Sequence, residues 1–443
     1  MKLIRFTVPA VILSLSLSAR ADDARQLVAQ KISADYASLD ALYKDFHAHP
    51  ELSLMETATA AKLAGELRAA GYEVTEKFGG TGVVAVLKNG PGPVLMVRSE
   101  LDALPVEEAT GLSYASTVKT KDLTGRETAV MHACGHDIHL TSLVGTARTM
   151  AAMKDRWGGT LIFIGQPAEE RLLGSRAMLA AGLYQKFPKP DFVVALHDDS
   201  VHAAGTVAVA PGAVTSNGDT VEIIVRGIGG HGAAPHVTKD PVLLAARIVV
   251  ALQTIVSRET DPREACVVSV GSIHGGTKAN IIPNDVKLQL TLRSYSDKVR
   301  AHTIEALKRI CRGEALSAGL PEELMPIVNV IADECTAATL NDPALAARVR
   351  GALVGALGAD AVKTAEPVMA SEDFSAFGRT DEHVPICTFD LGASDPAKLA
   401  EAERTGVPLP GPHNSKFAPV PEPTIKTGVA AMSAVALDLL AKK

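Results

Sequence analysis

Short apolar segments alternate with helical segments through the first half of the chain, and this alternation is the strongest constraint on the fold. The apolar segments cover residues 82–87, 94–97, 160–164 and 192–196, and their lengths are typical of buried strands. Sequence rich in alanine and leucine lies between them, most clearly after His136. This order predicts an α/β fold in which a mostly parallel central sheet is flanked by helices.

Polar side chains stand directly after three of these strands. Glu100 and Asp102 follow the second strand, Glu169 and Glu170 follow the third, and His197 follows the fourth. In open α/β sheets, ligands bind outside the carboxyl ends of the strands. We therefore expect these carboxylates and this imidazole to gather at one rim of the sheet.

Residues 130–139 concentrate groups that bind metals. Three histidines, one cysteine and one aspartate occur within this segment. Thiolates and imidazoles are good ligands for a borderline-soft divalent ion such as zinc, and the glycine between Cys134 and His136 allows both to point inward from one tight turn. The alternative is that these residues cap a helix or form hydrogen bonds in the core, but four such groups together favour a metal site.

The N-terminus has the pattern of a secretory signal peptide. Lys2 and Arg5 precede an apolar run over residues 6–17, and the small residues Ala19 and Ala21 offer a cleavage site. We expect residues 1–21 to be removed, with an uncleaved N-terminal anchor as the alternative. No later run is long and apolar enough for a transmembrane helix, so we expect the mature protein to be exported to the periplasm or secreted, free of the membrane.

Charge and cysteine content bear on the class of partner and on the state of the thiols. The net charge is -6, and the 44 basic residues are spread along the chain without a basic stripe, which argues against a nucleic-acid partner. Five cysteines are an odd number for an oxidising compartment. If Cys134 binds metal, then Cys266, Cys311, Cys335 and Cys387 form two disulfides or stay as buried thiols, and the sequence leaves both open.

A change of pattern near residue 213 indicates a second domain. A chain of 443 residues exceeds what one core usually holds. An alternating strand, a glycine-rich turn and a helix beginning at Asp240-Pro241 start the new pattern. We predict a discontinuous catalytic domain over residues 22–212 and 327–443, with a smaller α+β domain over 213–326 inserted through two chain crossings that act as a hinge.

Eight short motifs occur in a highly specific order and spacing. They are His49-Pro50-Glu51-Leu52, Asp102-Ala103-Leu104-Pro105-Val106, His132-Ala133-Cys134-Gly135-His136-Asp137, Gln166-Pro167-Ala168-Glu169-Glu170, Gly229-Gly230-His231, Asn280-Ile281-Ile282-Pro283, Ser371-Glu372-Asp373-Phe374 and Gly411-Pro412-His413. Through them the sequence resembles the metal-dependent amidohydrolases and peptidases that include carboxypeptidase G and the aminoacylases, most closely the plant auxin-conjugate amidohydrolases and the bacterial hippurate hydrolases. The resemblance covers nearly all of the mature chain, and it implies that the inserted domain serves as a lid and dimerisation domain in a homodimer.

The resemblance also implies a centre of two divalent metal ions. It matches Cys134, His136, Glu170, His197 and His413 to the protein ligands. The mixture of a thiolate with imidazoles favours zinc, with manganese, cobalt or nickel as alternatives.

Further residues around the metals acquire expected roles from the same resemblance. Glu169 matches the general base, His231 matches a lid histidine that stabilises the oxyanion, often from the partner subunit, and Asn280 matches a residue that binds the substrate carboxylate or carbonyl. Asp102 keeps its place in the family pattern and is expected to orient a ligand histidine. Glu100 departs from the pattern, since relatives often carry the shorter aspartate, so its role stays open. Whether His231 acts within its own chain or in the partner also stays open.

These assignments predict a hydrolase for small amide substrates. A metal-activated water, with Glu169 taking its proton and passing it to the departing amine, would cleave the amide bond of N-acyl amino acids or similar conjugates. A carboxypeptidase or dipeptidase acting on short peptides is the alternative among enzymes. A periplasmic solute-binding protein is the alternative of another class, and the adjacent Glu169 and Glu170 together with Cys134 argue against it.

Overall fold

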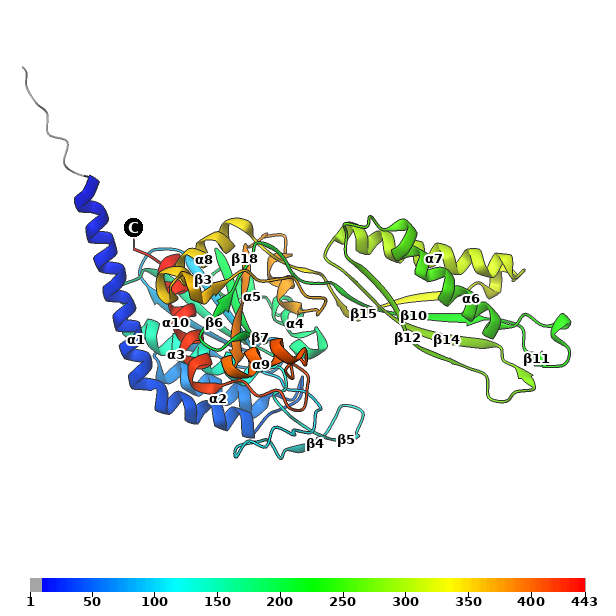
Figure 1. Cartoon of the computed structure of the whole chain (residues 1–443), viewed down its shortest axis with the longest axis horizontal. Coiled ribbons are helices and arrows are strands. Elements are labelled where there is room, and N and C mark those ends of the chain that lie inside the picture. The colour runs from blue at the N-terminus through cyan, green and yellow to red at the C-terminus, as the bar shows by residue number, and fades with distance from the viewer. Residues whose placement is uncertain (1–9, 443) are drawn as a thin grey trace, which may run out of the picture.

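The computed structural model describes residues 10–442, with side chains from residue 23 onward. Lys2, Arg5 and the start of the apolar run lie outside the described residues, so the signal peptide stays a prediction. From residue 10 the chain forms one continuous helix, α1 (Ala10–Ala48), which runs along the larger body of the molecule and extends beyond it (Figure 1).

An eight-stranded sheet forms the centre of the larger body, in the order β1-β2-β6-β3-β7-β18-β8-β17. Its four central strands, β6, β3, β7 and β18, run parallel, whereas β2 pairs antiparallel with β6. The mostly parallel sheet expected from the sequence is therefore confirmed. The strand bounds are β1 Glu73–Thr75, β2 Val83–Asn89, β3 Val94–Glu100, β6 Gly159–Gln166, β7 Phe192–Ala203, β8 Val207–Ala208, β17 Val362–Lys363 and β18 Ile386–Ser394.

Apolar side chains of the central strands alternate between the two faces of this sheet. On β3, Leu95 and Val97 belong to the core beneath the long helices, whereas Met96 belongs to the core on the opposite face with Phe374 and Phe377. A strand buried on both faces reads as a continuous apolar run, which explains the sequence pattern. The long helices are α1, α2 (Thr57–Ala69), α3 (His136–Ala152), α8 (Pro343–Leu357) and α10 (Pro421–Leu439), and the shorter ones are α4 (Gly174–Ala180), α5 (Leu183–Lys186), η6 (Asp373–Gly378) and α9 (Pro396–Thr405).

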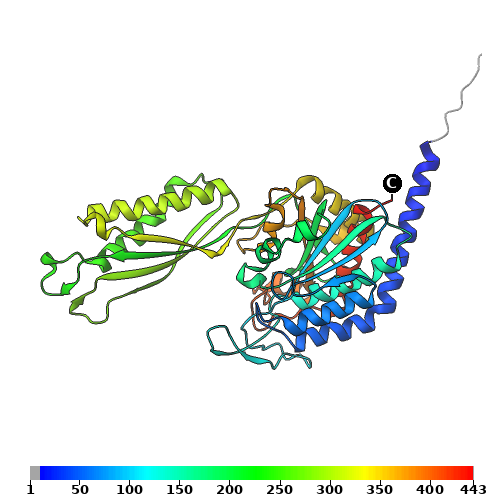
Figure 2. The ribbon, with the colours of Figure 1, turned by 180° about the vertical axis from the view of Figure 1, so that it is seen from behind.

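Residues 218–336 form a second unit, which we call the lid, with a four-stranded antiparallel sheet and a core of its own. It stands apart from the larger body in Figure 1 and in the reverse view of Figure 2. As the sequence indicates, Asp240 caps α6, because its side chain accepts hydrogen bonds from the backbone N–H groups of Val242 and Leu243. The lid elements are β10 (Gly218–Arg226), β11 (Gly230–His231), α6 (Pro241–Thr254), β12 (Cys266–Gly275), β13 (Ile281–Ile282), β14 (Asp285–Ser294), α7 (Asp297–Ser317) and β15 (Ile327–Thr336).

The strand β15 joins the lid sheet, whereas the expected boundary at residue 326 assigned it to the catalytic domain. It pairs with β10, with Val330 opposite Val221. Its sequence mixes short apolar runs with polar residues and has no regular alternation, so the sequence pattern does not tell which sheet it joins. The two chain crossings lie side by side, because β9 (Gly212–Thr215) pairs antiparallel with β16 (Thr339–Asn341).

One lid segment contradicts the expectation that no run after the signal peptide could span a membrane. Pro241–Glu259 has a mean hydropathy of 1.5 and is long and apolar enough to cross a membrane by length and composition, yet only 33% of this window is buried. The high hydropathy arises because α6 carries apolar residues on both sides. Val242, Leu243 and Val250 are exposed on the side turned away from the lid core, which explains the low buried share.

Candidate metal centre

The five predicted metal ligands come together at the rim of the large sheet. Cys134, His136 and His197 form one group, and Cys134, Glu170 and His413 form another, and within each group the ligand atoms all lie within 4.8 Å of one another. Cys134 belongs to both groups, and its Sγ lies 3.5 Å from His197 Nε2. Two groups that share one thiol could together hold two divalent ions.

A left-handed glycine shapes the turn that carries Cys134 and His136. Gly135 has a φ of 74° and directly precedes α3, and a Cβ at this position would collide with the carboxylate of Asp198. Glycine is therefore required both by the backbone conformation and by the space. The C-terminal segment is tied to the same turn, because the backbone N–H of His413 donates to the carbonyl of Ala133 at 2.6 Å.

Two ligand imidazoles, the buried His136 and the half-buried His197, are oriented by backbone carbonyls. His136 Nδ1 lies 2.7 Å from the carbonyl oxygen of Asp102, and His197 Nδ1 lies 2.7 Å from that of Asp198. Since a carbonyl only accepts, Nδ1 of each ring carries the proton and Nε2 keeps its lone pair for a metal. His136 Nε2 and Glu170 Oε1 are buried and have no hydrogen-bond partner in the described chain. Buried polar atoms are rarely left unpartnered, so these residues fit a metal ion.

Asp102 acts on the turn that carries the two glutamates. Its Oδ1 accepts from the backbone N–H of Glu169 at 3.2 Å, its Oδ2 accepts from that of Glu170 at 3.1 Å, and Oδ2 also accepts from the Ser53 hydroxyl at 2.6 Å. The expected link to a ligand histidine runs through the Asp102 backbone carbonyl rather than its carboxylate. Asp102 therefore positions both sides of the centre.

Glu169 and Glu170 lie at the same distance from the His136 imidazole. Glu169 Oε2 and Glu170 Oε1 are each 3.9 Å from His136 Nε2, and Glu170 Oε2 is also 3.4 Å from His413 Nε2. Burial, together with the carboxylates of Glu372 and Glu170, raises the pKa of Glu169 well above its usual range. A carboxylate of raised pKa is suited to taking and returning a proton near neutral pH.

His231 and Asn280 do not join this cluster in their own chain. His231 lies on β11 and is paired with Ile281 of β13, and the backbone N–H of Gly232 donates to the Asn280 carbonyl at 2.9 Å. Both views place this β11–β13 tip at the end of the lid remote from the large sheet (Figures 1 and 2). The structure therefore brings the two residues to each other but not to the metal ligands.

Sequence reasoning missed a buried arginine behind the centre. Arg98 on β3 forms an ion pair with Glu100, and its Nη2 lies 2.7 Å from Glu372 Oε1 and 3.2 Å from Asp373 Oδ1. Its Nε donates to Gln166 at 3.0 Å. A charged residue directly after four apolar strand residues was the available signal, because a buried charge requires partners.

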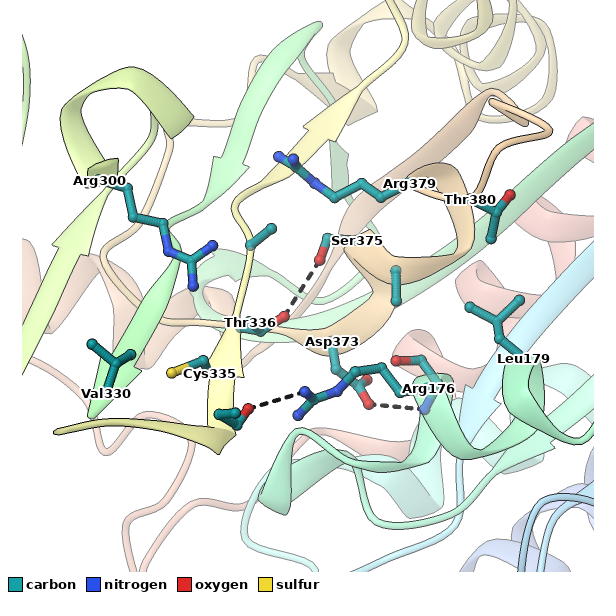
Figure 3. Close-up of a pocket in the computed structure, with 14 residues that line it drawn as sticks. Arg176, Leu179, Arg300, Val330, Cys335, Thr336, Asp373, Ser375, Arg379 and Thr380 are labelled. Carbon is teal, nitrogen blue, oxygen red and sulfur yellow. Dashed lines mark hydrogen bonds between the residues drawn. The ribbon is translucent and has the colours of Figure 1, made fainter. Parts of the chain in front are cut away.

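A cavity of about 500 Å³ lies between the lid and the larger body, separate from the metal ligands (Figure 3). Arg176 on α4 lines it and bridges the two units: its Nη1 donates to the Ala332 carbonyl of β15 at 3.0 Å, and its Nη2 donates to the Leu172 carbonyl at 2.7 Å. Leu172 follows the turn that carries Glu169 and Glu170, so the Arg176 side chain connects the lid strand β15 with the end of that turn.

The structure also settles the state of the cysteines. All five are free, and Cys311, Cys335 and Cys387 are buried. Of the two possibilities left open by the sequence, free thiols rather than two disulfides are therefore observed.

The fold and the clustered ligands define a metal-dependent hydrolase of amide or peptide bonds, and the comparisons agree. The model of peptidase family M20/M25/M40 matches residues 96–437, and the chain belongs to this family.

Three similar proteins illustrate the relationship. The hippurate hydrolase of Campylobacter jejuni is 38% identical over 334 residues, which is 75% of this chain and 82% of that protein. Thermostable carboxypeptidase 2 of Saccharolobus solfataricus is 35% identical over 404 residues, 89% of this chain and 93% of that protein. The crystal structure of a Bacillus subtilis dinuclear metal-binding peptidase of family M20 superimposes with a TM-score of 0.74 at 26% identity, covering 92% of this chain and 99% of that one.

Proposed function

We propose that the protein hydrolyses the amide bond of N-acyl amino acids or similar small conjugates with two bound divalent ions, zinc fitting best. The observation that carries this proposal is the pair of ligand groups sharing Cys134, with Glu169 beside them. The name of the Campylobacter jejuni relative, a hippurate hydrolase, supports an acyl-amino-acid substrate. The soft thiol with its imidazole neighbours supports zinc over manganese, cobalt or nickel.

The residues of this chain have distinct tasks in the proposed reaction. Cys134, His136, Glu170, His197 and His413 would hold the ions. Divalent ions, when bound, polarise the substrate carbonyl and acidify water. Glu169 then accepts a proton from the attacking water and returns it to the nitrogen of the departing amine, and both acts are needed to break an amide.

A substrate panel on metal-stripped and reloaded enzyme tests this proposal. Zinc should restore hydrolysis of benzoylglycine and N-acetyl amino acids, with manganese, cobalt and nickel compared in parallel. Faster hydrolysis of unblocked dipeptides or of longer peptides would favour the peptidase alternative, which the carboxypeptidase relative supports. A protein that binds these compounds but holds no metal and hydrolyses none of them would favour a solute-binding protein.

Cys134→Ala is expected to lose metal as well as activity. Cys134 Sγ belongs to both ligand groups, so its removal weakens both ion sites, whereas Cys266→Ala, a half-buried lid thiol, should keep both ions. Metal content by mass spectrometry of the purified variants measures this. Full metal content and full rate in Cys134→Ala would reduce Cys134 to a buried thiol.

We further propose that the protein is a homodimer joined through its lids. The exposed Val242, Leu243 and Val250 of α6 form an apolar side with nothing packed on it in the described chain, and a contiguous exposed apolar surface commonly marks an interface. The lid edge strand β12 also exposes an apolar side chain, Ile273. In such a dimer, we expect the β11–β13 tip of each lid to reach the partner's metal centre.

Export with cleavage after Ala21 remains a proposal as well. The side chain of Asp23 pairs with Arg156 at 2.7 Å, and Val28 and Ile32 are buried against the body, so a mature chain beginning at Asp22 keeps the packed part of α1. N-terminal sequencing of protein from a periplasmic fraction should begin at Asp22. Recovery of the full-length chain in the membrane fraction would instead support the uncleaved anchor.

A further inference from the structure

A second buried histidine stands one turn beyond His136 on α3. His139 is 1% exposed. Its Nδ1 lies 2.9 Å from Glu100 Oε2, and its Nε2 lies 2.8 Å from the backbone nitrogen of Asp198 and 3.1 Å from Asp198 Oδ1. Whichever protons the ring carries, it is held between Glu100 on one side and Asp198 on the other.

Asp198 connects His139 with the predicted metal ligand His197. Its backbone carbonyl accepts from His197 Nδ1 at 2.7 Å, and this bond directs His197 Nε2 toward Cys134. The ring of His139 also packs on the ring of His197, with centroids 4.6 Å apart and planes at 64°. In addition, the Asp198 carboxylate fills the space above Gly135. Asp198 therefore contacts both His197 and the turn that carries Cys134 and His136.

Glu100 is buried and held by contacts from two sides. It is fully buried and ion-paired with Arg98, which Glu372 and Asp373 hold from the other side. A carboxylate that must meet both Arg98 and His139 has no freedom to rotate away. The continuous series of contacts therefore runs from Arg98 through Glu100, His139 and the Asp198 backbone.

We propose that Glu100 and His139 are positioning residues of the metal centre, which fix the orientation of the His197 imidazole through the backbone of Asp198. This inference rests on the proposed function, because His197 must be a ligand for its orientation to affect metal binding. It also gives Glu100 the role that the sequence left open.

Two isosteric substitutions at one position separate the two contacts of the His139 ring. The amide of glutamine in His139→Gln can occupy the place of Nε2 and keep the contact with Asp198, whereas the amide of asparagine in His139→Asn can occupy the place of Nδ1 and keep only the contact with Glu100. Zinc affinity, measured by competition with a chromophoric chelator, should fall about 10- to 100-fold in His139→Asn, the usual scale for a partner behind a ligand. It should fall less in His139→Gln, and Glu100→Gln should lie between them.

Stability in the presence of chelator separates positioning from a merely structural role. His47→Asn is the matched control, because His47 is a buried histidine held between Asp137 and Glu108 that lacks a hydrogen bond to Asp198 in the described chain. His47→Asn should lower the thermal stability of the stripped protein, but its zinc affinity should stay close to that of the wild type. Equal zinc affinity in His139→Asn and wild type, or losses in both His139 variants that only follow the stability of the stripped protein, would overturn the inference. Absence of zinc binding in the wild type would instead overturn the proposed function.

Discussion

Glu169→Gln is expected to lower turnover by a factor on the order of 10² or more while leaving both metal ions bound. Glutamine has the same shape but cannot accept a proton from water or return one to an amine. The backbone N–H of Glu169 is held by Asp102, so the turn should keep its conformation. Turnover of an N-acyl amino acid and metal content, both measured on the same preparation, test the expectation.

Glu170→Gln is the informative companion, because the two carboxylates are equally far from His136 Nε2. Loss of a carboxylate ligand should reduce metal content in Glu170→Gln, which Glu169→Gln should not do. The reverse pattern, metal lost from Glu169→Gln and kept by Glu170→Gln, would exchange the two roles. Wild-type turnover in Glu169→Gln would exclude this residue as the base.

His231→Ala and Glu169→Ala are each expected to be nearly inactive alone, yet to regain activity when their subunits are mixed. The lid tip with His231 lies remote from its own metal centre, and we therefore propose that the oxyanion contact comes from a neighbouring chain. In a mixed dimer, one site combines an intact Glu169 with the partner's intact lid, and the other site lacks both. Random pairing makes about half of the dimers mixed, each with one intact site of two, so about a quarter of wild-type activity should return if the contact has its usual weight of a few kcal/mol.

A second mixture controls for nonspecific recovery. Glu169→Ala mixed with Cys134→Ala should stay inactive, because both substitutions lie on the larger body and every site then lacks one of the two groups. Subunit exchange must be verified by differently tagged chains. If exchanged mixtures of His231→Ala and Glu169→Ala remain as inactive as the separate variants, His231 works within its own chain or has no part in the reaction.

The sequence by itself determined four strands of the larger sheet, because burial on both faces leaves a continuous apolar run that local pattern reveals. Strands 94–97, 160–164 and 192–196 lie where that pattern predicts, as β3, β6 and β7. The rim of polar residues followed from the same pattern, since parallel strands bring their carboxyl ends to one edge. The specific roles of Glu169 and the ligands came from motif resemblance, and composition alone would not have supplied them.

Only the tertiary structure decided which distant groups meet. The sequence of β15 does not identify its sheet, and its pairing with β10 shows that it belongs to the lid. Glu100 was an unexplained departure until Arg98 and His139 appeared on either side of it. Periodicity along a chain records which side of an element is buried, whereas hydrogen bonds and ion pairs between remote segments depend on how the whole chain closes, which no local pattern encodes.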